Sequence, residues 1–309
     1  MSRSVFVVAG PTASGKTALS IALAQAVGGE IVSADSMQIY RGMDIGTAKA
    51  TPAEQAAVPH HMLDVADPGK NYSVARYVEE ASACCEDIFS RSKVPVITGG
   101  TGLYIDSLLS GRSFADSGDP ALRGELSAEY DRLGGETMLE RLRAVDPERA
   151  AALPSTDRRR IIRALEIYAL TGKTMSEHDR LTRSLPPRYE AVRIVLTYRD
   201  RALLYQRIEQ RVDKMIADGL FEEVASLLRQ GLDPGATALQ AIGYKEAALF
   251  LQGSLERESA VALIKQSSRR YAKRQITWFG RWEAPVILER DASPDVGHDL
   301  SLLRQKGVF

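Results

Sequence analysis

The chain has 309 residues, 44% of them apolar and 26% charged, so it can bury a sizeable core and is not disordered by composition. Forty basic residues balance forty acidic ones, so a nucleic-acid partner cannot be inferred from net charge and would require local basic patches. The only two cysteines, Cys84 and Cys85, are adjacent, which suits neither an ordinary disulfide nor a four-ligand metal site. With neither a signal-peptide pattern nor an apolar run of about 18 residues, we expect a cytoplasmic protein without a membrane span.

The first hundred residues alternate between strand-like and helix-like segments. Short apolar runs predict strands at residues 5–9, 30–36 and 94–100, and helical spacing predicts helices at 18–27 and 74–92. This alternation predicts an α/β fold with a doubly wound parallel sheet. Ligands of such sheets bind at the carboxyl ends of the strands, where "GPTASGKT", Asp35 and "GGTG" fall.

The sequence changes character near Gly111. A charge-rich, helix-prone stretch predicts a helical insertion at 112–187, which leaves a discontinuous core domain made of 1–111 and 188–309. A strand is predicted at 193–200 and one long helix at 203–228. The last third is predicted to be mostly helical and to end in the strand-like "PVILER".

The stretch "GPTASGKT", Gly10 to Thr17, fits the phosphate-binding pattern G-x-x-x-x-G-K-[ST]. Its glycines let successive backbone N–H groups point at one anion, and the following helix adds positive potential. Lys16 can reach the outer phosphate oxygens, and the Thr17 hydroxyl can ligate Mg²⁺. These residues predict a phosphate site but do not identify the ligand that carries the phosphate, which could be ATP.

Two polar positions follow the second and third predicted strands. Asp35 either caps the next element or aims its carboxylate at a substrate to accept a proton or a hydrogen bond. Thr101 in "GGTG" lies at the same rim, within what is also a tight strand-to-helix turn.

Two basic clusters are the candidates for contact with a polyanion. The first has four arginines in "DRRRIIRALE"; the second has Lys265, Arg269 and Lys273 spaced four residues apart on one helical face, followed by Trp278 and Trp282. Either cluster could instead be an ordinary solvated face. His60 and His61 have no further ligand at metal spacing, so we predict a loop or packing role for them.

Eight strings in order resemble one known family. They are "GPTASGKT", "SADSMQIYRGMDIGTAK", "PHHMLDV", "VPVITGGTGLYI", "RRIIRALEIY", "QRIEQRVDKMIADGLFEEV", "AIGYKE" and "YAKRQITWF". Together they resemble the tRNA dimethylallyltransferase (tRNA isopentenyltransferase) family over about nine-tenths of the chain. The zinc-finger cysteines of the eukaryotic relatives are missing, which indicates the bacterial type.

The resemblance implies a P-loop NTPase-like core that transfers a dimethylallyl group from dimethylallyl diphosphate to N6 of an adenosine. That adenosine lies directly 3′ of the anticodon in tRNAs that read codons beginning with U. The insertion at 112–187 would grip the anticodon stem-loop, Mg²⁺ would be the cofactor with Thr17 as its contact, and we expect a monomer.

The resemblance also implies a role for each matching residue. Asp35 would be the general base, and Thr101 would share the catalytic rim with it. The prenyl diphosphate would be bound by Gly10, Thr12, Ala13, Ser14, Gly15, Lys16, Thr17 and Arg211. The tRNA would be contacted by Asp35, Ser36, Met37, Gln38, Thr101, Arg123, Arg159, Arg160, Ile161, Ile162, Arg163, Gln240, Ala241, Ile242, Gly243, Tyr244 and Lys245.

Three alternatives share parts of this pattern. A P-loop small-molecule kinase would use the phosphate-binding loop, but this function would not explain either basic cluster. A free-adenylate isopentenyltransferase would keep the donor chemistry without needing the insertion. A non-catalytic tRNA-binding ATPase would keep the loop and the basic clusters.

Overall fold

The computed structural model describes residues 3–111, 118–291 and 295–309. The chain forms two compact units: the core unit runs to Leu109 and resumes at Tyr189, and the insertion unit is Ser110–Arg188. This division lies within two residues of the one expected from the sequence. Residues 112–117, where the predicted insertion begins, lie outside the described residues.

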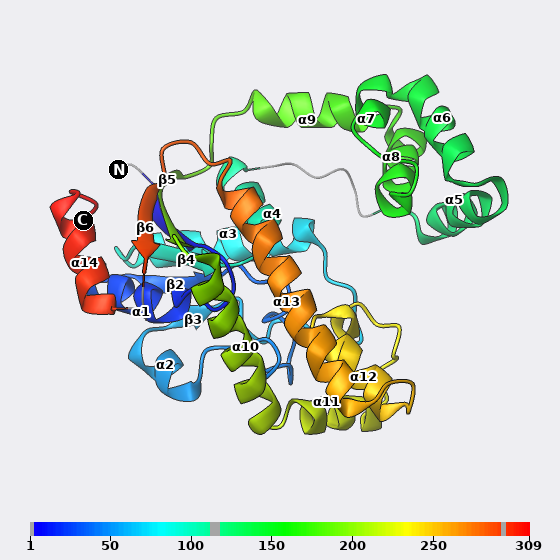
Figure 1. Cartoon of the computed structure of the whole chain (residues 1–309). Coiled ribbons are helices and arrows are strands. Elements are labelled where there is room, and N and C mark those ends of the chain that lie inside the picture. The colour runs from blue at the N-terminus through cyan, green and yellow to red at the C-terminus, as the bar shows by residue number, and fades with distance from the viewer. Residues whose placement is uncertain (1–2, 112–117, 292–294) are drawn as a thin grey trace. The chain divides into compact units, whose positions relative to one another are not determined.

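The core unit contains a single all-parallel sheet with strand order β3-β2-β4-β1-β5-β6 (Figure 1). The strands are β1 (Ser4–Ala9), β2 (Glu30–Ser33), β3 (His60–His61), β4 (Pro95–Gly99), β5 (Glu190–Tyr198) and β6 (Val286–Arg290). The predicted doubly wound α/β fold is confirmed.

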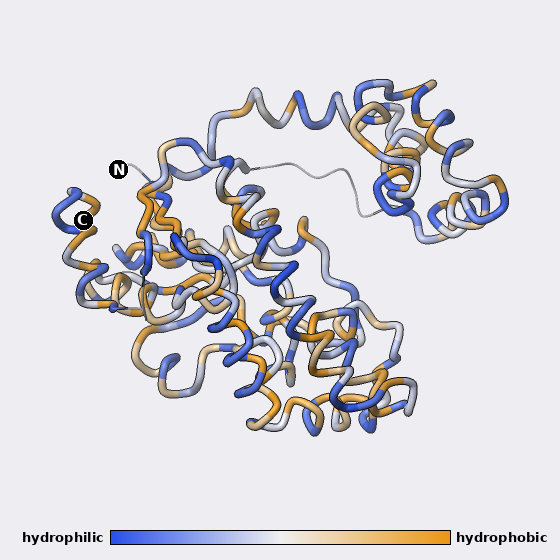
Figure 2. The backbone as a smooth tube through the Cα atoms, in the orientation of Figure 1, coloured by the Kyte–Doolittle hydropathy of each residue, from blue (hydrophilic) through white to orange (hydrophobic). Residues whose placement is uncertain are grey.

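Strand β1 lies in the interior of this sheet because its side chains are apolar on both faces. Val8 packs with Leu19 and Leu23 of the following helix on one face, and Val5 and Val7, no more than 1% exposed, are buried on the other. Much of the central sheet is accordingly coloured as hydrophobic in Figure 2.

Helices follow the strands and form the rest of the core unit. They are α1 (Lys16–Val27), α2 (Pro52–Ala57), α3 (Val74–Ser90), α4 (Gly102–Ser110), α10 (Arg201–Ala217), α11 (Leu220–Arg229), the 3₁₀ turn η1 (Ala238–Gln240), α12 (Tyr244–Leu251), α13 (Arg257–Phe279) and α14 (Val296–Gln305). A second apolar cluster joins α10–α13 to the loop after β2, through buried side chains such as Met43, Phe221 and Ile264.

Three predicted elements differ from the structure. The single helix expected at 203–228 is wrong, because Gly219 adopts φ 101° and divides it into α10 and α11. The chain does not end in a strand, because β6 is followed by α14, which the Asp295 side chain caps at the His298 N–H. Of the two roles expected for His60 and His61, the loop is wrong and the packing role agrees with the structure, because they form β3 and extend the sheet beside β2.

The insertion unit is helical, as predicted. Its helices are α5 (Pro120–Leu133), α6 (Gly135–Val145), α7 (Pro147–Ala151), α8 (Arg158–Thr171) and α9 (Met175–Arg183). It has an apolar core of its own in which Met138, Leu142 and Ile161 are fully buried.

Candidate active site

The phosphate-binding loop connects β1 to α1, as its sequence requires. Gly10 adopts φ 146°, and a Cβ there would lie 2.6 Å from the carbonyl oxygen of Leu196 on the neighbouring strand β5. Gly15 adopts φ 86° directly before α1. Because neither position tolerates a side chain without strain, the two glycines explain how the loop can wrap so tightly.

The loop presents unpaired donors where an anion could bind. Within the described part of the chain, the N–H groups of Gly15, Lys16 and Thr17 donate to no acceptor. The Ser14 hydroxyl is fully buried, also without a partner. Free N–H groups at a helix N-terminus, beside a buried hydroxyl, favour a bound anion, so this arrangement fits a diphosphate.

The Lys16 side chain binds to carbonyl groups of its own loop. Its ammonium donates to the carbonyl oxygens of Gly10, at 3.0 Å, and Pro11, at 2.7 Å. Burial, reinforced by the nearby Arg211 guanidinium and opposed by Asp35, lowers the pKa of Lys16 to about 7. Burial also lowers the pKa of Arg211, whose guanidinium donates to the Thr47 carbonyl at 3.4 Å. Thus Lys16, Arg211 and Asp35 act on one another electrostatically, although 195 residues separate Lys16 from Arg211 in the sequence.

A further arginine of α10, which sequence reasoning missed, touches the loop directly. Arg207 donates from Nε to the Ala13 carbonyl at 3.1 Å. Ala13 adopts φ 63°, which is unusual for a residue with a side chain. Arg207 lies one helical turn before Arg211, so the spacing in "QRIEQR" was the available signal.

Asp35 lies just beyond β2, which ends at Ser33 and so is shorter than predicted. Its Oδ1 accepts from the N–H groups of Met37, at 2.9 Å, and Gln38, at 3.4 Å. This cap turns the chain and ends the strand. Oδ2 has no hydrogen bond to any described residue, so half of the carboxylate stays available to a substrate.

Thr101 fastens the turn after β4 to the Asp35 turn. Its hydroxyl accepts from the Ser36 N–H at 3.0 Å and lies 3.3 Å from Ser36 Oγ, and its own N–H donates to the Ala34 carbonyl. A Cβ at Gly99 would lie 2.1 Å from the Ala34 oxygen, so this close approach needs glycine. The contacts support a positioning role for Thr101 more directly than a chemical one.

The remaining positions beside Asp35 are partly committed to the fold. The Gln38 amide accepts from Ser33 Oγ and donates to the carbonyls of Thr47 and Ala48. Its side chain is therefore unavailable for tRNA unless these bonds break. Ser36 and Met37 are half-buried.

Among the positions 240–245, the structure exposes two and buries three. Gln240 and Lys245 are exposed, Ile242 is half-buried, and Ala241, Gly243 and Tyr244 are buried. The expected tRNA contacts at these six positions stay predictions, and Gln240 and Lys245 are the two whose side chains are exposed. Tyr244 donates its hydroxyl to Glu223, and this contact together with burial raises the pKa of Tyr244.

Glu223 is the second residue that sequence reasoning missed. Its carboxylate accepts from three successive backbone N–H groups, those of Asp44, Ile45 and Gly46, at 2.9, 2.8 and 3.2 Å. A Cβ at Gly46 would lie 2.4 Å from the Tyr244 ring. Helices α11 and α12 thereby clamp the loop that follows Asp35.

Two members of the second basic cluster, Lys265 and Arg269, are paired within the core unit. Lys265 pairs with Asp213 at 2.6 Å, and Arg269 pairs with Glu209, so the acids of α10 neutralise much of the stripe. Trp278 and Trp282 both donate their indole N–H groups to Asp106, at 2.7 and 2.9 Å. These four residues therefore serve helix packing, whereas Lys273 is exposed.

In the insertion unit, the arginines of α8 differ in how free they are. Arg163 and Arg123 both pair with Glu166, whose side chain is fully buried. Arg160 pairs weakly with Asp157 at 3.3 Å. Arg159 is exposed and makes no ion pair with any residue that the structure describes.

Two further predicted tRNA contacts on α8 face inward. Ile161 is 0% and Ile162 6% exposed, and both pack in the core of the insertion unit. Their side chains occupy the apolar face of this amphipathic helix, and the prediction that these two positions contact tRNA stays a prediction.

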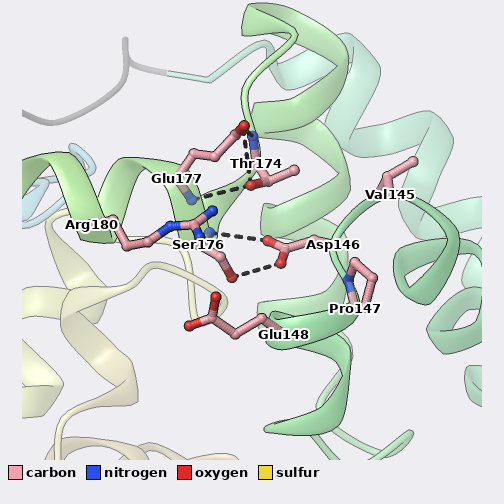
Figure 3. A pocket seen from close by; sticks show the side chains of 8 residues that line it. All are labelled: Val145, Asp146, Pro147, Glu148, Thr174, Ser176, Glu177 and Arg180. Carbon is pink, nitrogen blue, oxygen red and sulfur yellow. Dashed lines mark hydrogen bonds between the residues drawn. The ribbon is translucent and has the colours of Figure 1, made fainter.

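A cavity of about 320 Å³ in the insertion unit is lined by residues of α7 and α9 and the segments before them (Figure 3). Its buried Asp146 accepts from Arg149 N–H and from both N–H and hydroxyl of Ser176, and Glu177 forms a capping box with Thr174. The polar groups drawn there mainly satisfy helix ends, and none of the predicted site residues lines the cavity.

No group of three or more metal-ligating side chains occurs among residues 3–111, 118–291 and 295–309. Over the same ranges no helix is long and apolar enough to cross a membrane. A divalent ion that needs few protein ligands still fits the loop, because the hydroxyl of Thr17 makes no hydrogen bond to a described residue.

Comparison with known proteins identifies the family. The family model described as IPP transferase matches residues 38–282. The tRNA dimethylallyltransferase of Thermoanaerobacter sp. (strain X514) is 45% identical over 281 residues, covering 90% of this chain and 89% of the relative. The chain belongs to the IPP transferase family.

Solved structures agree with this membership. The tRNA isopentenylpyrophosphate transferase of Bacillus halodurans matches with a TM-score of 0.72 and 38% identity, over 98% of this chain and 96% of that one. A eukaryotic dimethylallyltransferase acting on tRNA matches with a TM-score of 0.80 and 30% identity, over 99% of this chain and 78% of that one.

As a member of the IPP transferase family, the chain is a transferase, and the kinase and ATPase alternatives are not favoured. A family model described as Isopentenyl transferase also matches, but only over residues 3–65. The IPP transferase match continues through the insertion unit to α13 and beyond, so the alternative of a free-adenylate enzyme is not favoured either.

Proposed function

We propose that this chain transfers a dimethylallyl group from dimethylallyl diphosphate to N6 of the adenosine 3′ of the anticodon, in tRNAs that read codons beginning with U. One arrangement carries the proposal: an anion cradle with Lys16 and Arg211 lies within electrostatic range of a half-free Asp35 carboxylate. Family membership and the names of the relatives supply the identity of the two substrates.

The donor diphosphate would accept hydrogen bonds from the N–H groups of Gly15, Lys16 and Thr17. Lys16 would turn from the Gly10 and Pro11 carbonyls toward the phosphate oxygens, and Arg211 would neutralise further charge. Donors fixed where charge develops typically lower a barrier by about 3–4 kcal/mol each. Thr17 would hold Mg²⁺, which when bound stabilises negative charge on the departing diphosphate.

At the acceptor side, N6 forms a bond to the allylic carbon C1 while the bond from C1 to the diphosphate oxygen breaks and its electron pair leaves with the diphosphate. The adenine amine loses one proton, which Asp35 Oδ2 would accept. A positioned base of this kind typically contributes about 10²–10⁴-fold to the rate. Thr101 would keep the Asp35 turn in place.

The tRNA would bind through exposed residues in each unit: Gln240 and Lys245 of the core, and Arg159 and Arg160 of the insertion. An unpaired anticodon loop lets the target base leave its stack at a cost of at most a few kcal/mol. A sequence with only two cysteines, which are adjacent and so unsuited to an ordinary disulfide, and a tRNA substrate support a cytoplasmic location. We propose a monomer, since the site as described uses residues of one chain.

The test is an incubation of the protein with labelled dimethylallyl diphosphate, Mg²⁺ and either unmodified tRNA or AMP. Label in tRNA and not in AMP is expected, and mapping by nuclease digestion should place it on the adenosine 3′ of the anticodon. Label in AMP, or ATP hydrolysis without prenyl transfer, would overturn the proposal.

A further inference from the structure

Helix α13 presents one face to the end of strand β4. Tyr271, Gln275 and Trp278 are spaced four and three residues apart and so lie on that face. Tyr271 and Gln275 both donate to the Gly100 carbonyl, at 3.2 and 3.0 Å, and Trp278 binds Asp106 of α4. The proposed function gives none of these residues a role.

Gln275 differs from its two neighbours because it also reaches the phosphate-binding loop. Its Oε1 accepts from the Thr12 N–H at 2.8 Å while its Nε2 donates to Gly100. The side chain is 4% exposed, so water cannot readily replace either bond. The orientation of the amide is determined by its partners. A flipped amide would place its NH₂ group against the Thr12 N–H and its oxygen against the Gly100 carbonyl.

Each end of this bridge leads to one half of the candidate active site. Thr12 belongs to the same loop as the N–H groups and Lys16 that form the anion cradle, three residues before Gly15. Gly100 directly precedes Thr101, whose hydroxyl binds the Ser36 N–H beside Asp35. A Cβ at Gly100 would lie 2.2 Å from Gln275 Nε2, so this glycine leaves room for the bridge.

We propose that Gln275 is a positioning residue that fixes the separation between the phosphate-binding loop and the Asp35 turn. The inference rests on the proposed function, because only a reaction between a loop-bound donor and an acceptor at Asp35 needs both halves in register. Gln275 touches neither substrate in this scheme; it acts through Thr12 on one side and through Gly100 and Thr101 on the other.

Two substitutions separate the halves of the bridge. Gln275→Met removes both hydrogen bonds at nearly constant length. Gln275→Glu keeps an oxygen for the Thr12 N–H but replaces the donor to Gly100 by a second acceptor, which pushes the Gly100–Thr101 turn away.

The first measurement is binding of inorganic pyrophosphate with Mg²⁺ by calorimetry, which needs no tRNA. Gln275→Met should weaken binding about three- to tenfold, the equivalent of one lost hydrogen bond. Gln275→Glu should stay within about threefold of the wild type, because the loop contact survives.

The second measurement is steady-state prenyl transfer with both substrates varied. Both variants should lose kcat by roughly ten- to a hundredfold, since a misplacement of about 1 Å can cost that much. Only Gln275→Met should also show a raised KM for the donor. This split distinguishes positioning from a general loss of folded protein.

Two controls on the same helix complete the design. Gln266→Met removes an exposed amide and should leave both measurements unchanged, and Ile264→Val loosens the buried side of α13 without touching the bridge. Unchanged kcat in both Gln275 variants, or an equal loss of kcat in Ile264→Val, would overturn the inference. If the wild type transfers no prenyl group, the proposed function fails, and the pyrophosphate measurement alone then decides whether Gln275 positions the loop.

Discussion

The two carboxylate oxygens of Asp35 differ in their hydrogen bonding. Oδ1 is committed to the N–H groups of Met37 and Gln38, whereas Oδ2 has no partner among the described residues. A capping Asp and a base aimed at the substrate were alternative interpretations of the sequence. The geometry allows both at once, because capping uses only one oxygen.

Asp35→Asn should therefore separate chemistry from structure. The amide keeps Oδ1 as an acceptor for the turn but cannot take the N6 proton, so kcat should fall about 10²–10⁴-fold. The Kd for tRNA should stay within about threefold, and the melting temperature should hardly change. Asp35→Ala is the matched variant, because it also removes the cap and should cost about 1 kcal/mol of stability. A variant Asp35→Asn that keeps more than a tenth of kcat would exclude Asp35 as the base.

Lys16 leads to a prediction about pH. With its pKa lowered to about 7, the free protein carries a neutral Lys16 amine above that pH, and a bound diphosphate would restore the charge. Binding at pH 8 should therefore take up close to one proton, and affinity should fall as pH rises above 7. Below about pH 6 the amine is already charged and the uptake should disappear.

The measurement is calorimetry of pyrophosphate binding in buffers with different heats of ionisation. Lys16→Met is the reference, since protons carried by the pyrophosphate itself are common to both proteins. Equal proton uptake by the two proteins would show that Lys16 does not titrate on binding.

At the scale of elements, the sequence predicted correctly those helices and strands whose formation depends on neighbouring residues in the chain. The strand–loop–helix unit from β1 to α1 follows from its apolar run and its glycines, and the apolar strand β4 follows likewise. The break at Gly219 and the extra helix α14 were missed although their signals, a glycine at a helix end and an Asp cap, are present in the sequence.

Contacts between distant segments could not be read in this way. Nothing in the sequence around Glu223 or Gln275 indicates a special role. Their hydrogen-bond partners lie 177 and 263 residues away in the chain and are brought to them only by the fold. The same reason explains why the sequence did not show that the side chains of Ile161 and Tyr244 are buried. A residue that belongs to a sequence motif of a family can lie on either the buried or the exposed face of its helix, and the motif alone does not show which.

The Glu223 clamp gives a prediction at this scale. Glu223→Gln loses charge-assisted bonds to the N–H groups of residues 44–46 and should lower the free energy of unfolding by about 1–3 kcal/mol. Denaturant unfolding measures the change, and Glu222→Gln, at the exposed neighbouring position, is the control. Equal stability of the two variants would mean that the clamp contributes nothing measurable.

At the scale of the whole molecule, a protein with no net charge is proposed to bind a polyanion, so a few unpaired cations must supply the affinity. Ion pairs remove Lys265, Arg269 and Arg163 from that set, whereas Arg159 is exposed and has no ion-pair partner in the described part of the insertion unit. Neutralising Arg163 would also leave Glu166 short of a partner and confuse binding with stability.

Arg159→Gln is therefore the variant that tests the proposed tRNA contact. It should weaken tRNA binding severalfold and reduce the slope of log K against log salt by somewhat less than one, as expected for one lost phosphate contact. The slope is measured by filter binding over a range of salt concentrations. Arg143→Gln on α6, where the arginine is already paired with Glu140, should leave the slope unchanged. An unaltered slope in Arg159→Gln would return this arginine to an ordinary solvated face, because a phosphate contact cannot be lost without releasing fewer counterions.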